Sequence, residues 1–122
     1  MAEVRLIDNL KGVLYYLDTP LLDFEIKDRE LIRAENLSNG KFFPQELSIY
    51  GVTYGNINAF FNRRTMKEGC MYYHEHLRNL GFDRMIFDKY IEKNNGNNHL
   101  DNFWVRFEDF GARSFTDLIN IV

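Results

Sequence analysis

The hydrophobic pattern of this chain changes its period near Pro44, and this change constrains the fold more than any other feature of the sequence. Before that point, residues 21–27 (LLDFEIK) alternate between apolar and polar side chains, the pattern of a half-buried strand. Residues 12–18 are rich in β-forming residues, Asp18-Thr19-Pro20 is typical of a turn, and residues 30–36 predict a third, weaker strand. We therefore expect an antiparallel β-meander at the start of the chain.

After Pro44 the apolar residues recur at helical spacing instead. Residues 54–63 predict a short helix, and an apolar stripe ending at Gly81 predicts a second one, with this glycine in the left-handed position that often follows a helix. The stripe consists of Met66, Cys70, Tyr73, Leu77 and Leu80. A third helix is expected to begin with Asp83 as its N-cap and Phe82 packed on Phe87.

The third helix should end in the polar run NNGNN at residues 94–98, because Asn and Gly tolerate positive φ angles and compete for backbone hydrogen bonds. Residues 103–109 (FWVRFED) then predict a strand, with Phe103 and Trp104 on opposite faces. A capping pattern from Ser114 to Asp117 predicts a last short helix. The sequence thus predicts an α+β fold, with an N-terminal antiparallel β-meander, a central helical segment of two to three helices, a closing β-strand and a short C-terminal helix.

The 122 residues fit one domain, and 45% hydrophobic residues are ample for a single core. The single cysteine, Cys70, cannot form an intramolecular disulfide, and its place in the apolar stripe predicts a small core residue. We find no targeting signal and no apolar run long enough to span a membrane, so we expect a cytoplasmic protein.

The formal charge of −3 is mild. A dedicated duplex-DNA-binding domain is usually strongly basic, because phosphate contacts supply much of its affinity. The charge is unevenly spread, however: residues 1–40 carry five Lys/Arg against eight Asp/Glu, and residues 60–93 carry seven against five. We therefore expect a weakly dipolar protein and place duplex-DNA binding low among the possible functions.

Three candidate sites have simpler structural explanations. In His74-Glu75-His76 the histidines are two apart, so on a helix they diverge, whereas a helical zinc motif needs two histidines four apart. Cys70 and His74 are one helical turn apart, but no third residue is evident to orient a catalytic pair. The amides of residues 94–98 suit a phosphate or another ligand, yet the turn already accounts for them. We expect no metal site and no cofactor.

A minimal Mg²⁺-dependent nuclease is an alternative that the second predicted strand leaves open. Asp23, Glu25 and Lys27 match the carboxylate-x-Lys element of restriction-type nucleases, in which carboxylates bind Mg²⁺ and the lysine stabilises the attacked phosphate. Such a site needs an earlier acid on a neighbouring strand, whereas Asp18 lies in the turn itself. The solvated face of an amphipathic strand explains the same residues more simply.

A basic and aromatic cluster at the predicted junction of two helices is the candidate partner-binding site. It contains Arg63, Arg64, Lys67 and Tyr72, with Trp104 and Arg106 on the polar face of the closing strand as a second group. Such a surface suits structured RNA, single-stranded nucleic acid or an acidic protein patch. An ordinary solvated connection between helices explains the cluster equally well.

The motifs together resemble the small N-terminal-type domain found alone or ahead of the kinase in HipA-like proteins of Firmicutes and their mobile elements. The similarity covers residues 12–107 and comprises VLYYLDTPLLDFEI, FFPQELSIYG followed by INAFFNRR, Arg64 ahead of a helix ending at Leu80-Gly81, and Gly96-x₄-Asp101-x-Phe103-Trp104-Val105. The resemblance implies that Asp101 caps the reversal after the asparagine run and that Trp104 anchors the strand.

The chain departs from this family pattern in three respects. The proline that commonly follows the Arg64 position is replaced by Thr65, and Cys70 stands where a second basic residue is common. The ATP-binding and catalytic motifs of the kinases lie in a following domain that these 122 residues do not contain. The resemblance therefore implies an accessory or stand-alone module without phosphotransfer of its own, such as a regulatory partner of a HipA-like kinase in a toxin–antitoxin system.

Surplus aromatic residues, a basic cluster opposed by an acidic sheet region and the lack of a convincing catalytic set favour a different function. We expect a non-enzymatic interaction protein of a bacterial mobile element or phage that binds and restrains a larger cytoplasmic protein or nucleoprotein. Inhibitors of host-defence nucleases, such as anti-CRISPR proteins, have this profile. The regulatory kinase partner and the minimal nuclease remain the alternatives.

Overall fold

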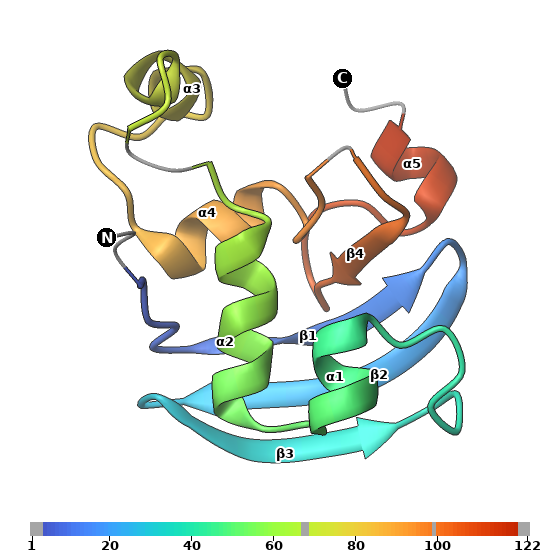
Figure 1. Ribbon diagram of the computed structural model, residues 1–122. Helices are drawn as coiled ribbons and strands as arrows, with labels where there is room; N and C mark the ends of the chain where they lie inside the picture. Colours follow the sequence, from blue (N-terminus) through green and yellow to red (C-terminus); the bar gives the residue numbers. More distant parts are fainter. Residues whose placement is uncertain (1–3, 67–68, 99, 120–122) are drawn as a thin grey trace.

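The computed structural model describes residues 4–66, 69–98 and 100–119 and confirms the α+β class (Figure 1). A four-stranded antiparallel sheet has the order β3-β2-β1-β4. Its strands are β1 (Leu10–Tyr16), β2 (Thr19–Lys27), β3 (Glu30–Asn36) and β4 (Phe103–Arg106). The helices in the described residues are α1 (Gln45–Tyr50), α2 (Tyr54–Arg63), α3 (Tyr73–Asn79), α4 (Phe87–Lys93) and α5 (Phe115–Ile119).

The meander is closed by two tight turns. Asp28 and Arg29 both have positive φ angles, 51° and 64°, as in the type I′ turns whose twist matches that of paired strands. The turn between β1 and β2 lies at Leu17 and Asp18, so the prediction of a turn at Asp18-Thr19-Pro20 is displaced, and Thr19 already pairs with β1. The third strand has the predicted bounds.

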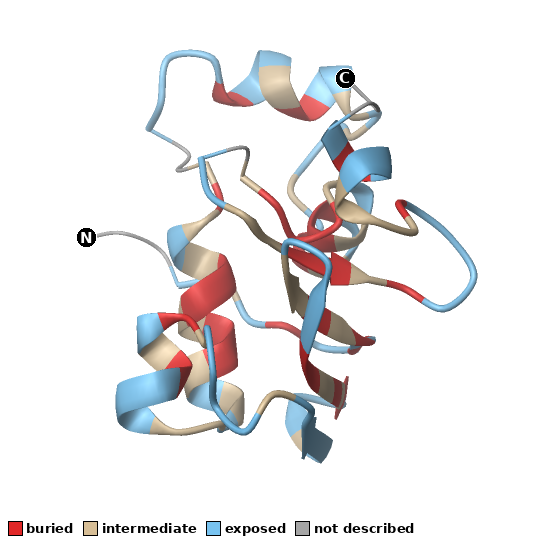
Figure 2. Ribbon diagram, turned by 90° about the vertical axis from the view of Figure 1, so that its right-hand side faces the viewer, coloured by how far each residue is buried: buried red, intermediate tan, exposed pale blue. Residues whose placement is uncertain are grey.

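The main core lies between one face of the sheet and helices α1 and α2, which cover that face (Figures 1 and 2). Alternate residues of the strands point into this core, as the period-two pattern predicts, and α2 adds the apolar side of its helix. The most buried contributors are Leu14, Leu22, Phe24, Ile26, Ile57, Phe60, Phe61, Val105 and Phe107. Thr53 caps α2 by accepting a hydrogen bond from the Asn56 amide at 3.1 Å, so this helix has its predicted bounds.

The stretch between α2 and α4 differs from the prediction. The described part of the Met66–Leu80 stripe is helical only in α3, and Cys70 is exposed rather than in the core. The N-cap predicted at Asp83 is also wrong, because α4 begins at Phe87 after the extended residue Ile86. Tyr73 and Leu77 of α3 form a separate cluster with Tyr90 of α4; Phe82 packs against this cluster, whereas Phe87 belongs to the main core.

The C-terminal segment packs on the opposite face of the sheet. There Trp104 of β4 and Tyr15 of β1 stack with ring centroids 4.8 Å apart, and Ala112 and Leu118 cover them. The predicted capping of α5 is confirmed by the hydrogen bond from the Asp117 amide to Ser114 Oγ, 3.1 Å long. The described C-terminal residues cover the part of this face around Trp104, and the groove described below lies on the same face.

Candidate functional site

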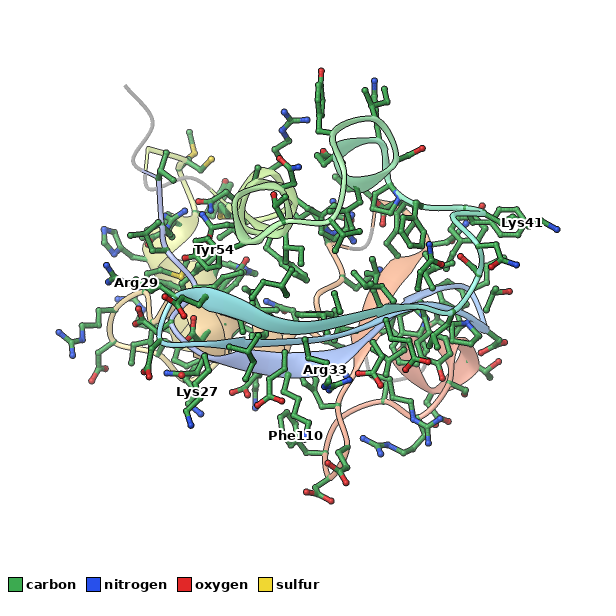
Figure 3. The ribbon with its side chains drawn as sticks, turned by 90° about the horizontal axis from the view of Figure 1, so that it is seen from below. Lys27, Arg29, Arg33, Lys41, Tyr54 and Phe110 are labelled. Carbon is green, nitrogen blue, oxygen red and sulfur yellow. The ribbon has the colours of Figure 1, made fainter. Side chains whose placement is uncertain are left out.

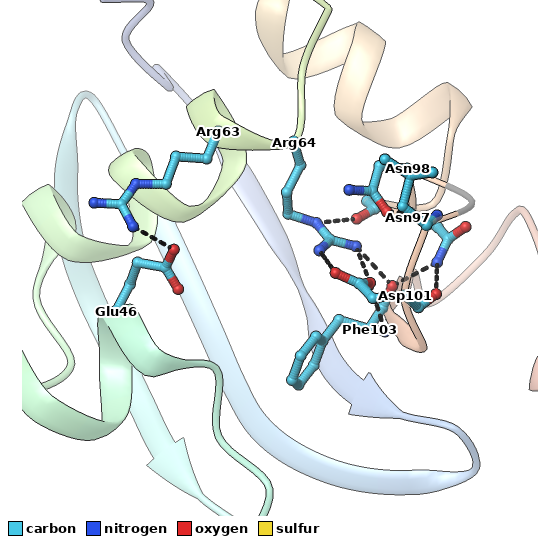
Figure 4. A network of polar contacts seen from close by, with 9 residues as sticks. Glu46, Arg63, Arg64, Asn97, Asn98, Asp101 and Phe103 are labelled. Atoms are coloured by element: carbon cyan, nitrogen blue, oxygen red, sulfur yellow. Dashed lines mark hydrogen bonds and ion pairs between the residues drawn. The ribbon is translucent and has the colours of Figure 1, made fainter.

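Arg64, predicted to bind a partner, is a structural residue. Its side chain is 8% exposed and forms a bidentate ion pair with Asp101, in which Nη2 lies 2.8 Å from Oδ1 (Figure 4). Its Nε donates to the Gly96 carbonyl at 3.1 Å and its Nη2 to the Phe103 carbonyl at 3.0 Å. The guanidinium carbon lies 4.7 Å from the centre of the Phe60 ring. Arg64 therefore joins the end of α2 to the turn before β4, and little of its side chain stays exposed for the partner contact predicted for it.

The asparagine run turns its amides inward, as the turn interpretation predicts. Asn95 has a φ of 51°, and its side-chain Nδ2 donates to the Val105 carbonyl at 3.2 Å. The backbone carbonyl of Asn95 accepts a hydrogen bond from the Val105 amide at 2.6 Å. Asn97 donates to the carbonyls of Asp101 and Phe103 at 3.2 and 2.7 Å. These bonds hold the chain reversal together, and they occupy the side-chain amides of Asn95 and Asn97.

Trp104, also predicted to bind a partner, is fully buried. Its indole N–H donates to the Leu17 carbonyl at 2.6 Å, and its ring lies beneath Ala112 and Leu118. The strand pattern placed it on the correct face of β4, opposite Val105, but this part of the face is covered. The family resemblance implied an anchoring role for Trp104, and its position is compatible with that role.

The other predicted contact residues lie apart. Arg63 points to solvent, with 68% of its side chain exposed, and its Nη1 lies 2.9 Å from Glu46 of α1 (Figure 4). Tyr72 is 64% exposed just before α3. Arg106 is half-buried on the outer face of the sheet, whereas Lys67 lies outside the described residues. Arg63, on α2, and Arg106, on the outer face, thus lie on opposite sides of the sheet and do not share a surface.

A groove of about 960 Å³ lies on the sheet face opposite α1 and α2, and it is the candidate site. Its floor contains the outward-pointing residues of the strands, including Val13, Tyr15 and Arg106. One wall is the segment after β4, and α4 contributes Lys89 and Glu92 at the other side. Figure 3 shows Arg33 and Phe110 on this side of the sheet, away from the helices that cover the inner face.

Arg113 braces the wall that follows β4. Its guanidinium donates to the carbonyl of Glu108 at 2.7 Å and also to the carbonyls of Phe107 and Phe110. The Phe110 ring stacks on Phe107, with centroids 4.9 Å apart and planes inclined by 10°. Phe110 nevertheless stays 47% exposed at the groove. The loop therefore presents a half-exposed aromatic side chain in a fixed position.

The groove carries charges of both signs in nearly equal number. The cations are Lys11, Lys27, Arg33, Lys89, Arg106 and Arg113, and the anions are Asp23, Glu25, Glu92, Glu108 and Asp109. Arg33 lies between two of the carboxylates, with Nη1 at 2.7 Å from Asp23 and Nε at 3.9 Å from Glu25. The hydrogen bond with Asp23 raises the pKa of Arg33, because it stabilises the charged guanidinium.

This ion pairing bears directly on the nuclease alternative. A Mg²⁺ site needs carboxylates that are free to coordinate the ion, whereas Asp23 and Glu25 face the guanidinium of Arg33. Within the described residues, no group of three or more His, Cys, Asp and Glu side chains is placed to hold a metal ion. The nuclease therefore gains no support from the arrangement of Asp23, Glu25 and Lys27.

His76 of α3 and Tyr90 of α4 form a polar contact between these two helices. His76 Nε2 lies 2.7 Å from the Tyr90 hydroxyl, and the two rings are in edge contact. Burial raises the pKa of Tyr90, because the charged phenolate is poorly solvated there. His76 thus has a structural partner in α4, and it diverges from the exposed His74 as the spacing predicts.

Sequence reasoning missed the groove and its wall. The signal available was RFEDFGAR at residues 106–113, in which two phenylalanines and a glycine lie between two arginines. The strand predicted over residues 103–109 includes part of this segment, whereas β4 ends at Arg106 and Arg113 returns to bind the carbonyls that follow it. Residues 106–113 form a groove wall only because the segment packs beside the folded sheet.

Comparison of the chain with protein-family models, curated proteins and solved structures found no match. The resemblance to HipA-like domains therefore stays a prediction from motifs. Of the helices described, none combines the length and apolar character needed to cross a membrane.

Proposed function

We propose that the chain is a non-enzymatic binding module that holds a larger protein, alone or within a nucleoprotein, in the groove on its outer sheet face. The supporting observation is Phe110, which stays half-exposed on a loop braced by Arg113. Aromatic residues held rigidly at a concave surface often carry much of the energy of a protein interface. Because the loop is already ordered, binding costs little additional conformational entropy.

The charge of the groove favours protein over bare nucleic acid as the bound surface. A nucleic-acid site gains affinity from an excess of cations that displace counterions from phosphates. Here six cations are balanced by five anions, and Arg33 shares its charge with Asp23 and Glu25 while 40% of its side chain stays exposed. A partner surface with charges of both signs matches such a lining better, since unlike charges then meet across the interface.

Affinity capture with matched variants tests this proposal. The tagged chain, Phe110→Ala and Ile49→Ala would each be incubated with extract of the organism that encodes the chain, with and without nuclease. Ile49 is 62% exposed on α1, on the other side of the sheet, and is the control for loss of an exposed apolar side chain. We expect one larger protein to be retained by the wild type and by Ile49→Ala, and binding by Phe110→Ala to be weakened at least about tenfold.

Three outcomes contradict the proposal. If nothing is captured by the folded wild type, the binding function is wrong. If the partner is retained by Phe110→Ala but lost from Arg63→Ala combined with Tyr72→Ala, binding occurs at the exposed residues between α2 and α3 instead. Loss on nuclease treatment alone would show that nucleic acid, not protein, makes the contact.

A further inference from the structure

The outer edge of β3 is open to solvent. β3 is the first strand in the sheet order, and its residues are exposed except for the half-buried Leu31. Figure 3 views the molecule from this side, with β3 the strand nearest the viewer. An open edge offers backbone N–H and C=O groups to another strand, and proteins usually protect such edges with charges or bulges. β3 carries charged residues and a bulge at Ile32, and the order of its charges indicates which strand can pair with it.

The pairing with β2 defines which backbone groups of β3 point outward. The Leu37 amide donates to the Leu21 carbonyl at 2.8 Å, and Glu35 and Arg33 lie opposite Asp23 and Glu25. Hydrogen bonding alternates along an antiparallel strand, so residues 33, 35 and 37 bond to β2. The intervening residues Ala34 and Asn36 therefore direct their N–H and C=O groups away from the sheet.

The charges on the β3 edge are complementary to those on the same edge of a second, antiparallel copy. Arg33 and Glu35 are two residues apart, so they share the outer face and lie on either side of Ala34. In an antiparallel pair of identical strands centred on Ala34, Arg33 of each copy lies opposite Glu35 of the other. The Ala34 residues of the two copies would then exchange two backbone hydrogen bonds.

We propose that two copies of this chain associate through β3 in this register, forming a continuous eight-stranded sheet. Sliding one strand by two residues would place Arg33 opposite Arg33 or Glu35 opposite Glu35, and both arrangements are repulsive. Sliding by one residue would exchange the two faces of the incoming strand. The register shift at Ile32 ends the regular edge, which leaves the Arg33–Glu35 pairs and the Ala34 pair inside the regular segment.

Exposed apolar side chains beside the charged pairs are also consistent with a second copy of the chain as the partner of β3. Ile32 is 52% exposed and Leu37 43% exposed, one near each end of the proposed contact. The twofold axis would lie perpendicular to the sheet, as in other isologous pairs of edge strands. The grooves of both copies would consequently face the same side, although the proposal does not depend on their function.

The test measures the molar mass of the purified chain in solution by light scattering over a concentration series. We expect the wild type to approach twice the mass of one chain. Glu35→Arg should raise the dissociation constant at least about tenfold, because two attractions become two repulsions. Glu75→Arg, which makes the same charge change at an exposed position of α3, should leave the dissociation constant unchanged.

A mixing experiment makes the assignment specific. Arg33→Glu and Glu35→Arg should each be monomeric alone, whereas an equimolar mixture should form a heterodimer, since each pair then joins a glutamate to an arginine. Arg33→Glu also loses ion pairs with Asp23 and Glu25, so its folding is followed by circular dichroism. If it does not fold, Glu35→Arg and Ala34→Pro decide the question, because proline at position 34 removes the outward N–H and no hydrogen bond to β2; its effect on the strand backbone is followed by circular dichroism.

The proposal is overturned by a wild type that stays monomeric at every accessible concentration. It is equally overturned if the dimer persists in both Glu35→Arg and Ala34→Pro, because another surface would then be responsible. Failure of two folded, singly substituted chains to associate when mixed would reject the register.

Discussion

Replacing Arg64 by alanine is expected to destabilise the fold, and the adjacent Arg63 offers a matched control. Both arginines belong to the cluster that the sequence marks as a contact surface. Their surroundings differ, because Arg64 is 8% exposed and Arg63 is 68% exposed. The same chemical change therefore tests whether burial and hydrogen bonding, rather than membership of a basic cluster, determine the role of an arginine.

The magnitude follows from the groups that lose a partner. Arg64→Ala removes the ion pair with Asp101 and the donors to the carbonyls of Gly96 and Phe103. A hydrogen bond from a charged donor contributes about 1.5–3 kcal/mol, and losing one partner of a fully buried pair costs about 3–5 kcal/mol. Asp101 is 38% exposed and can rehydrate, and Phe103 keeps its bond from Asn97. We therefore expect a total of about 3 kcal/mol, less than the sum of the parts.

Thermal and urea unfolding measure this difference. Arg64→Ala should lower the Tm by roughly 10 °C, whereas Arg63→Ala, which loses only an exposed ion pair, should cost less than about 1 kcal/mol. Arg64→Lys keeps the charge but not the planar fork, so it should restore little of the stability. A fall in Tm of less than about 3 °C for Arg64→Ala would refute the structural role assigned here.

Three further predictions test other parts of the fold. Gly96→Ala should prevent stable folding, as judged by circular dichroism, because its Cβ would lie 2.7 Å from Val105 Cγ2 at a φ of 62°. Burial raises the folded-state pKa of Tyr90. Its contribution to the free energy of unfolding is therefore fully present below the unfolded-state pKa of about 10 and is lost as the pH rises through the folded-state pKa. Urea unfolding should show that Tyr90→Phe loses less stability at alkaline pH than the wild type. Cys70 is exposed, so a thiol reagent should modify it in the native protein as fast as in the unfolded chain; strong protection would contradict its placement.

Much of the fold could be predicted because it depends on local pattern. The alternation in LLDFEIK locates a strand with Phe24 and Ile26 inside, and the apolar side of residues 54–63 locates α2. Ser114 and Asp117 similarly predict the start of α5. In each case a few neighbouring residues determine the backbone, whatever the rest of the chain does.

The helix predicted across Met66–Leu80 failed for a physical reason. Tyr73 and Leu77 do face one apolar cluster, and Met66 and Leu80 pack against it. Spacing shows that residues can share a side, but it does not show that the chain between them is helical. Cys70 has the correct spacing and is nonetheless exposed.

The site depends on contacts that are distant in the sequence. Arg64 and Asp101 are 37 residues apart, so nothing near Arg64 indicates that its charge is already paired. The period-two pattern placed Trp104 opposite Val105, but it could not show that Ala112 and Leu118 return to cover the ring. The role of Arg113 has the same origin, since the carbonyls that it binds define the wall only once β4 has joined the sheet.

The position of β1 between β2 and β4 has a consequence for synthesis in the cell. β1 can pair with β2 as soon as both have left the ribosome, but its other edge must wait for β4, since Tyr15 pairs with Trp104. The indole of Trp104 and the Leu17 carbonyl that it binds are 87 residues apart, a delay on the order of ten seconds at ordinary translation rates. During that interval the nascent meander exposes an unpaired edge and an apolar face, so the yield of native protein should rise when translation outpaces aggregation.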